Sequence, residues 1–398
     1  MRTPSPAHPL LLGAVIVLVA LNLRPVLASV GPLLPAIQQD MPISFSAASL
    51  LTTLPVLAMG LACFVGFRIA RYLGTAQTIG YSLLCLALAT GVRFWVGSTT
   101  GLLATALLAG LGIAIVQTLI PAIIKANFGS RVPAVMGFYV TAIMAGATFA
   151  AAGAPVIADF SEWRGGLAHW AWLTLAACLA WAWLTRKRAL AIPASGTEPG
   201  PRFWKNRRSW KLASLFGLGT GAYVCVLAWL APYAIEQGYS DKQAGLLLGF
   251  LTLMEVVAGL VFPAWANRGR DRRPVLFTLC ALQLLGFGGL ALAPEAGLPL
   301  WAGIIGLGIG GFFPMSMIVT MDHQDDPLQS GRLTAFVQGI GYIIAAVTPW
   351  ISGIMRDQLH SFEFAWLLLV VGAIVIFILS LNLGPASYRR AFPSTHRG

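Results

Sequence analysis

The tetrapeptide Gly110-Leu111-Gly112-Ile113 occurs again as Gly306-Leu307-Gly308-Ile309, 196 residues further along the chain. Two more matches keep this spacing or come within two residues of it: Ser44, Ala48, Leu50 and Leu51 return as Ser240, Ala244, Leu246 and Leu247, and Ala36-Ile37-Gln38-Gln39 returns as Ala234-Ile235-Glu236-Gln237. Glycine-rich matches between apolar segments also arise by chance. Three matches in chain order at nearly one offset nevertheless indicate a parallel internal repeat.

The chain is far too apolar for a water-soluble protein. Of its 398 residues, 57% are hydrophobic and 10% are charged, and the mean hydropathy is +0.78. A soluble domain carries about a quarter of charged residues. Apolar runs long enough to cross a bilayer as helices recur from Leu10 to Leu383, whereas a membrane barrel would show alternating segments of about ten residues. The sequence therefore predicts an all-α membrane protein.

The predicted helices form two groups of six around one polar stretch. We expect an uncleaved first span and eleven more, over residues 10–37, 45–67, 75–96, 100–125, 132–158, 164–185, 210–236, 242–267, 274–293, 298–321, 330–355 and 362–384. The polar stretch is rich in proline, glycine and basic residues, as linkers are. The predicted organisation is an N-terminal six-helix bundle (1–185), a cytoplasmic linker (186–208) and a C-terminal six-helix bundle with a short cytoplasmic tail (209–398).

Lys and Arg are distributed very unevenly between the two predicted sides of the membrane. If both termini lie on one side, that side holds 21 of the 26 basic residues, and the other holds Arg93, Arg164, Lys242 and Arg356. The positive-inside rule then places both termini in the cytoplasm, in a multi-pass protein of the bacterial inner membrane. The net charge of +12 is expected to meet anionic membrane lipids rather than nucleic acid.

Arg24 is the one basic residue near the middle of a predicted span. A guanidinium at this depth costs about 3 kcal/mol or more, so we expect it to face a cavity and to have a partner. In the functional interpretation, its planar donors bind a carboxylate, a cyanate or a nitro group of a solute. In the structural interpretation, neighbouring carbonyls or a carboxylate hold it in place.

Glu255 is the one acidic residue deep in a predicted span. Because a charged carboxylate is costly there, Glu255 is the candidate for binding and releasing a proton during transport. Two alternatives stay open: a permanent ion pair with Arg24, and a neutral carboxyl group hydrogen-bonded inside the second half. A direct pair would leave Arg24 less free for an anion.

Little in the sequence points to catalysis or to a metal. The five cysteines lie inside apolar runs and form no CxxC motif, and no nucleotide-binding signature occurs. The segment Asp322-His323-Gln324-Asp325-Asp326 resembles a ligand cluster, but its position between a span and Pro327 favours a solvated turn. We expect no metal, no cofactor and no enzymatic activity.

Several motifs together resemble one branch of a known family. Asn22-Leu23-Arg24-Pro25 with Ser29-Val30-Gly31-Pro32, and Gln338-x2-Gly341-Tyr342 with Pro349, are similar to the cyanate-permease and nitroimidazole-transporter branch of the major facilitator superfamily. The resemblance covers essentially the whole chain and implies the major facilitator fold. The loop over residues 66–74 departs from it, because it lacks the acidic residue and the Arg pair usual there.

The resemblance also suggests which polar residues line a central cavity. The fourth, fifth and eleventh helices line the cavity or its seams in this superfamily, and these helices carry Gln117, Tyr139, Gln338 and Tyr342. Asn22 on the first helix and Tyr223 and Trp229 on the seventh complete the predicted substrate-binding set with Arg24. Each of these residues alone is more typical of helix packing than of ligand contact.

The sequence therefore predicts a proton-coupled secondary transporter that works as a monomer. Two bundles are expected to rock about a central site, moving a small polar or anionic solute such as cyanate, a nitroimidazole or a related heteroaromatic. Within this class, a proton-driven exporter of a drug or toxic compound is the alternative. From another class, a non-transporting membrane sensor stays open, although a sensor would usually add a soluble domain.

Overall fold

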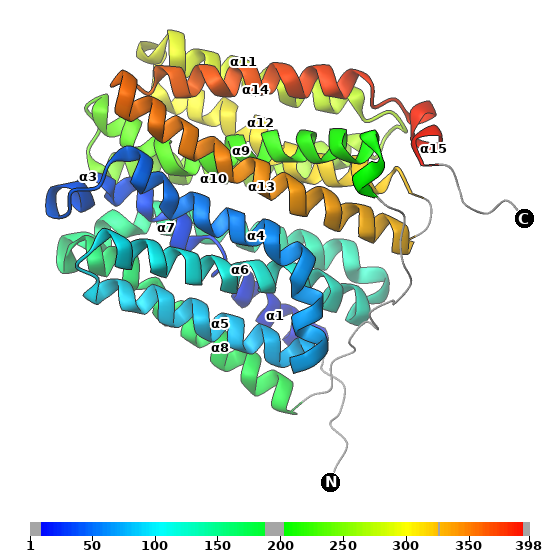
Figure 1. Cartoon of the computed structure of the whole chain (residues 1–398), viewed down its shortest axis with the longest axis horizontal. Helices are drawn as coiled ribbons and strands as arrows, with labels where there is room; N and C mark the ends of the chain where they lie inside the picture. The colour runs from blue at the N-terminus through cyan, green and yellow to red at the C-terminus, as the bar shows by residue number, and fades with distance from the viewer. Residues whose placement is uncertain (1–8, 188–202, 325–326, 393–398) are drawn as a thin grey trace, which may run out of the picture.

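Two bundles of helices make up the protein, seen in a computed structural model that describes residues 9–187, 203–324 and 327–392. Within these ranges the regular elements are helices and no strand occurs, as predicted. In Figure 1 the N-terminal bundle is the lower half, and the C-terminal bundle is the upper half. Most of the predicted linker, residues 188–202, lies outside the described residues.

The long helices follow the predicted spans closely. The N-terminal bundle contains α1 (Pro9–Ala20), α2 (Pro25–Ala28), α3 (Val30–Asp40), α4 (Phe45–Leu73), α5 (Thr75–Val92), the 3-10 helix η1 (Arg93–Trp95), α6 (Thr99–Asn127), α7 (Val132–Ala168) and α8 (Trp170–Lys187). The C-terminal bundle contains α9 (Arg207–Glu236), α10 (Asp241–Ala266), α11 (Arg273–Leu292), α12 (Leu298–Met321), α13 (Pro327–Leu359), α14 (Glu363–Leu381) and the short α15 (Tyr388–Ala391).

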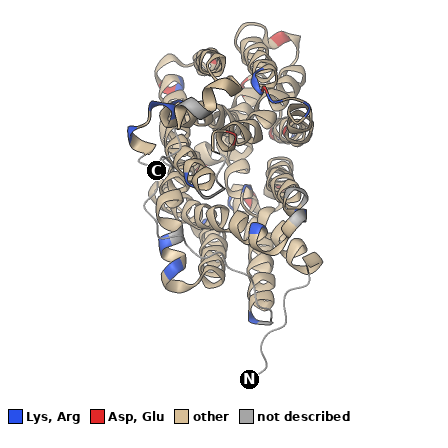
Figure 2. Cartoon of the chain, turned by 90° about the vertical axis from the view of Figure 1, so that its right-hand side faces the viewer, with Lys and Arg blue, Asp and Glu red and all other residues tan. Residues whose placement is uncertain are grey.

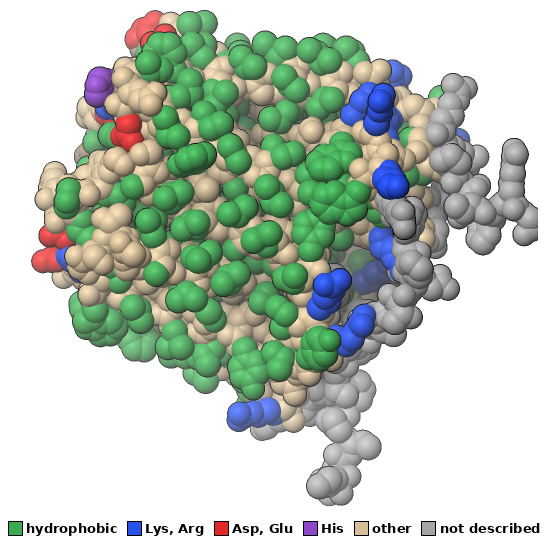
Figure 3. Space-filling model, in the orientation of Figure 1, with side chains coloured by type: hydrophobic (Ala, Val, Ile, Leu, Met, Phe, Trp, Pro, Cys, Tyr) green, Lys and Arg blue, Asp and Glu red, His purple; other side chains and the backbone are tan. Residues whose placement is uncertain are grey.

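The outer surface of these helices suits a bilayer. Eleven segments of the described chain are long and apolar enough to span a membrane, and α8, packed against α5 and α1, completes the six of the N-terminal bundle. Hydrophobic side chains cover the middle of the face in Figure 3, with Lys and Arg at its right-hand end and Asp and Glu at its left-hand end. We call these the basic end and the acidic end. Figure 2, which looks onto the basic end, shows Lys and Arg on both bundles.

The repeated glycines make equivalent contacts in the two bundles. Gly110 of α6 lies against Pro55 of α4, and Gly306 of α12 lies against Leu251 of α10, so that a Cβ on either glycine would clash with backbone atoms. Pro55 and Leu251 are themselves 196 residues apart. Because glycine lets two helices approach closely, both copies of the repeat build the same helix contact. The two six-helix repeats expected from the sequence are confirmed.

The first span is not the single helix predicted over residues 10–37. Residues 21–24 separate α1 from α2, which begins at Pro25. Proline lacks an N–H group, so the carbonyl four residues earlier loses its helical donor. The Asn22 side chain stabilises the break. It donates a hydrogen bond to the Leu18 carbonyl (2.7 Å) and accepts one from the Thr174 hydroxyl of α8 (2.9 Å).

The turn predicted between the fifth and sixth spans, after residue 158 and before residue 164, is confirmed. The label α7 extends to Ala168, but Ser161 and Glu162 within it have non-helical backbone angles, so α7 consists of two helices. Glu162 has a φ of 57° and a ψ of 178°, a conformation that is almost restricted to glycine and costs about 1–3 kcal/mol. The first helix therefore ends here at the acidic end, and the chain turns back so that Gly166 lies against Ala154 and Ala158.

The two bundles contact each other through α4 with α13, α7 with α10 and α3 with α9. At the acidic end these contacts are polar. Asp357 of α13 accepts hydrogen bonds from the backbone N–H groups of Phe45 and Ser46 at the start of α4, at 2.9 and 2.8 Å. Lys242 of α10 pairs with Asp159 of α7 at 2.6 Å. These contacts tie the bundles together at the acidic end.

Candidate functional site

Arg24 lies in the break of the first span, as the residue that precedes α2. It is only 5% exposed. Its Nη1 is 3.7 Å from the sulfur of Met59 on α4, and its Nε has no hydrogen-bond partner. None of the ion pairs in the described ranges includes Arg24. Because a thioether is a weak acceptor, the guanidinium is buried without the strong acceptor that a carboxylate would provide.

Three tyrosines from both bundles surround this guanidinium. Its central carbon is 5.5 Å from the centre of the Tyr223 ring on α9. Arg24 also interacts electrostatically with Tyr139 of α7 and Tyr342 of α13. The hydroxyl groups of Tyr139 and Tyr223 are buried and have no hydrogen-bond partner. The structure therefore brings together four of the predicted residues, and they offer several free hydrogen-bonding groups at one place.

Glu255 of α10 belongs to the same centre. It is 2% exposed, and neither of its carboxyl oxygens has a hydrogen-bond partner. It interacts electrostatically with Arg24, yet the two side chains are not within the 4.0 Å of an ion pair. The described residues thus contain neither the ion pair with Arg24 nor the hydrogen-bonded neutral carboxyl group that the sequence left open.

Met59 is a member of the candidate site that was not predicted from the sequence. It is 2% exposed and supplies the sulfur next to Arg24. Met59 lies 196 residues before Glu255, which is the offset that relates α4 to α10. The repeat therefore gave a signal that could have found it, since the counterpart of a central carboxyl group is expected at the centre of the other bundle.

In the described residues, none of the remaining predicted side chains hydrogen-bonds to Arg24. Gln117 of α6 and Gln338 of α13 are half-buried, and the Gln117 side-chain oxygen is buried without a partner. Asn22 is engaged within the N-terminal bundle, as described above. Trp229 donates to the carbonyl of Pro349 (3.0 Å) and packs on Phe45. Its position in this structure is therefore with the contacts of the acidic end.

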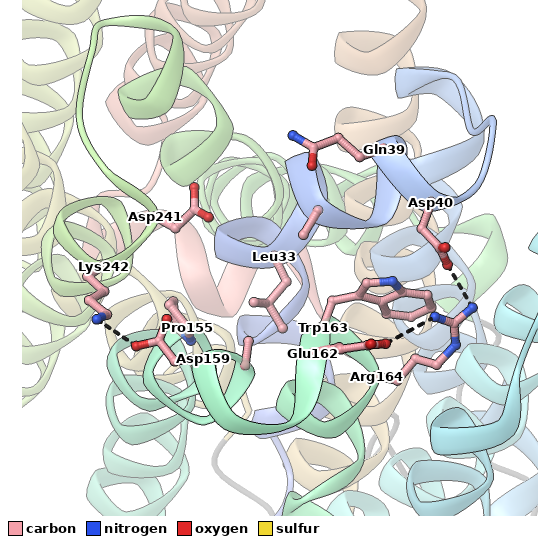
Figure 4. Close-up of a pocket in the computed structure, with 12 residues that line it drawn as sticks. Leu33, Gln39, Asp40, Pro155, Asp159, Glu162, Trp163, Arg164, Asp241 and Lys242 are labelled. Carbon is pink, nitrogen blue, oxygen red and sulfur yellow. Dashed lines mark ion pairs between the residues drawn. The ribbon is translucent and has the colours of Figure 1, made fainter.

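A pocket of about 480 Å³ lies at the acidic end between α3, α7 and α10. Figure 4 shows its charged residues arranged around the rim, where Arg164 pairs with Asp40 at 2.7 Å and Lys242 pairs with Asp159. Glu162, at the kink of α7, also lines it. The pocket is therefore a polar vestibule at the junction of the bundles.

The cluster after α12 is only in part the solvated turn that we expected: Asp322 is exposed in a turn, His323 is buried, and Asp325 and Asp326 lie outside the described residues. His323 is 4% exposed, and its Nε2 accepts a hydrogen bond from Nε of Arg208 on α9 at 3.0 Å. Burial, assisted by the charge of Arg208, lowers the pKa of His323 to about 4. Asp322 pairs with Arg272 at 2.9 Å. The cluster connects helices at the basic end.

Two bundles of the same construction, an apolar outer surface and a polar centre at their junction define a membrane transporter with two moving halves. The match to a family model agrees with this class. The chain belongs to the Major Facilitator Superfamily, whose model matches residues 10–329.

Curated relatives confirm the resemblance to the cyanate and nitroimidazole branch. The chain is 38% identical over 375 residues to the cyanate transport protein CynX of Escherichia coli K12, covering 94% of this chain and 97% of that protein. It is 25% identical over 377 residues to the 2-nitroimidazole transporter of the same organism, covering 94% of each. The chain is therefore a multi-pass secondary transporter of small solutes.

Solved structures show the same fold at low identity. The crystal structure of a D-xylose–proton symporter superposes with a TM-score of 0.74 at 12% identity, covering 94% of this chain and 97% of that one. The nucleoside transporter NupG superposes with a TM-score of 0.72 at 14% identity, covering 94% of this chain and 99% of that one. These similarities confirm the major facilitator fold.

Proposed function

We propose that this transporter moves a small anionic or strongly dipolar solute, with cyanate as the first candidate, and that Arg24 binds it. The observation that carries the proposal is the buried guanidinium of Arg24, which lies 3.7 Å from a thioether and forms no ion pair with a carboxylate of the described residues. A buried charge without a carboxylate is costly by several kcal/mol. An anion that enters the site would supply the missing partner, and the guanidinium fork suits a small planar group.

The tyrosines set further limits on the solute. The unpaired hydroxyl groups of Tyr139 and Tyr223 would donate to oxygen or nitrogen atoms of the solute, and the rings would pack against a flat molecule. The similarity to a cyanate transport protein and, at lower identity, to a 2-nitroimidazole transporter supports this choice. A nitroimidazole combines a flat ring with a nitro group, so export of such a compound is our second candidate.

Glu255 is the proposed coupling group. Its unpaired, buried carboxyl group is suited to carry a proton while the bundles rock between their inward-open and outward-open orientations. In the proposed cycle, the solute occupies Arg24 and a proton occupies Glu255, and the bundles then rock about the site. We propose that the basic end faces the cytoplasm, where anionic lipids contact its Lys and Arg side chains, and that the protein acts as a monomer.

The direct test is uptake of [14C]cyanate into proteoliposomes. We expect uptake by the wild type and its loss in Arg24→Ala, with Arg24→Lys intermediate because lysine keeps the charge without the fork. Arg71→Ala removes an exposed arginine of α4 at the basic end and serves as the matched control, with uptake unchanged. Full uptake by Arg24→Ala would refute the role of Arg24. If no cyanate moves, 2-nitroimidazole is tested next, and absence of any flux would favour the sensor.

A further inference from the structure

Arg93 is a second buried guanidinium in the N-terminal bundle, and it is one of the four basic residues that the sequence assigns to the non-cytoplasmic side. It is the first residue of η1 and is 0% exposed. The other three basic residues assigned to the same side pair with carboxylates: Arg164 with Asp40, Lys242 with Asp159, and Arg356 with Glu236. In the described ranges no ion pair includes Arg93, so its charge needs another explanation.

The contacts of Arg93 connect two helices. Its Nε donates to the Thr105 hydroxyl of α6, and its Nη1 donates to the backbone carbonyl of Val26 in α2, each at 3.2 Å. The Thr105 hydroxyl in turn donates to the Leu102 carbonyl at 2.7 Å, which fixes its orientation. The Nη2 of Arg93 is buried without a partner. Arg93 is therefore anchored on α6 and reaches across to α2.

The position of the Val26 carbonyl gives this contact its importance. Val26 is two residues after Arg24, inside a helix of four residues that follows the break of the first span. Only Ser29 separates α2 from α3, and its backbone angles are helical (φ −77°, ψ −17°), so Val26 lies in the first turn of a longer helical segment. The first turn after a break has few hydrogen bonds of its own, so contacts with neighbouring elements help to fix its place and that of the Arg24 guanidinium.

Packing alone does not account for an arginine at this position. A methionine or leucine would fill similar volume without the cost of a buried, unpaired charge. What an apolar side chain cannot provide is a strong, directed donor to a backbone carbonyl next to a break. We propose that Arg93 is a positioning residue of the solute site, which holds α2 through Val26 and thereby places Arg24. This inference rests on the proposed role of Arg24 in binding the solute.

Hydrogen–deuterium exchange of the purified protein tests the positioning itself and requires no solute. We expect Arg93→Met to speed exchange of the amides of residues 26–30 at least tenfold. Thr105→Val, which removes only the anchor of Nε, should produce a smaller increase in the same peptide, and the exposed-site control Arg71→Met should produce none. Unchanged exchange in Arg93→Met would overturn the proposal, whatever the solute is.

Transport kinetics separate positioning from general structural support. Misplacing Arg24 should raise the KM for [14C]cyanate about tenfold in Arg93→Lys, which keeps the charge but loses the fork, while the maximal rate per folded molecule stays within twofold. A merely structural role would lower the amount of folded protein and leave KM unchanged, which would contradict the proposal. If Arg93→Met does not fold, Arg93→Lys and Thr105→Val are measured in both assays. If wild type moves no cyanate, the proposed substrate fails, and the exchange result still decides the role of Arg93.

Discussion

Arg24 and Glu255 lie on opposite sides of the junction between the bundles, and each is buried without a hydrogen-bonded carboxylate or cation. Opposite charges in a low-dielectric interior attract strongly, and a close pair would satisfy both. Because the two groups interact without forming an ion pair, each of them is available to bind and release another partner. In the proposed cycle these partners are the solute and the proton.

Met59→Glu should close the solute site by giving Arg24 a permanent partner. The introduced carboxylate would stand where the sulfur now lies 3.7 Å from the guanidinium, and a charge-assisted pair would compete with the anion. We expect the KM for cyanate to rise tenfold or more, measured by uptake into proteoliposomes. Met59→Leu keeps the volume and should change KM less than threefold. Equal KM values in the two variants would contradict the proposed site.

Glu255→Gln should separate solute binding from the driving force. Glutamine keeps the size of the side chain but cannot carry a proton on and off, so accumulation driven by a pH gradient should be lost. Counterflow of cyanate at equal pH on both sides should persist within about threefold. Gradient-driven accumulation in this variant at the wild-type level would exclude Glu255 as the coupling group.

Part of the site could be predicted because a charge inside an apolar run is visible in the sequence. Arg24 and Glu255 were found in this way, and the tyrosines followed from the family resemblance. The burial of Arg93 could not be predicted, because a charge at the end of a span is interpreted as a loop residue unless the tertiary structure shows that it is buried. Met59 was missed because a methionine in a span has no distinguishing chemistry.

At the scale of the elements, the helix lengths and the turn at Ser161 were predictable, and the interruption of the first span was not. Hydropathy finds a span by its mean value, so the break at residues 21–24 did not interrupt the apolar pattern. Pro25 gave a local signal of the break, since proline removes a helical hydrogen bond. The turn at Ser161 and Glu162 also had a signal, because polar and charged residues interrupt the apolar pattern there.

The elements at the basic end are joined by a cluster that should respond to pH. Arg208 of α9 donates to His323 after α12 and, at 2.6 Å, to the Ser387 hydroxyl before α15. Because the pKa of His323 is lowered to about 4 in the folded protein and is about 6.5 in an unfolded chain, the unfolded state binds more protons between these values. The contribution of His323 to the free energy of unfolding is therefore fully present above pH 6.5 and is lost as the pH falls towards 4.

We expect the melting temperature of the detergent-solubilised protein to fall between pH 7 and pH 4.5, with up to about 3 kcal/mol lost through His323. His323→Gln keeps an acceptor for Arg208 and does not titrate, so its melting temperature should change less over the same range. The same decrease in both proteins would show that other groups cause it.

For the whole molecule, polar contacts between the bundles hold the acidic end closed in this structure. Asp357 accepts two backbone hydrogen bonds from the start of α4, across the junction between the bundles. Each hydrogen bond to a charged group contributes about 1.5–3 kcal/mol, and the N-terminus of a helix favours a negative charge. Together with the pair of Lys242 and Asp159, this contact must be released when the acidic end opens.

Asp357→Asn should therefore shift the population towards an open acidic end, because an amide accepts these N–H groups less strongly than a carboxylate. We expect the distribution of distances between spin labels on α4 and α13 at this end to gain a longer component, measured by double electron–electron resonance. Asp40→Asn breaks an ion pair inside one bundle, with Arg164, and is the matched control with no added component. Identical distance distributions in Asp357→Asn and wild type would rule out this role for Asp357.

The contact of Arg24 with Met59 also has an evolutionary consequence. Positions 59 and 255 correspond at the offset of 196 that relates α4 to α10. If the two halves descend from one duplicated unit, this methionine and this glutamate occupy what was one ancestral position. The two halves now differ at the centre, with a cation beside a thioether in the first and an acid in the second, so a second copy of either half could not supply what the other contributes.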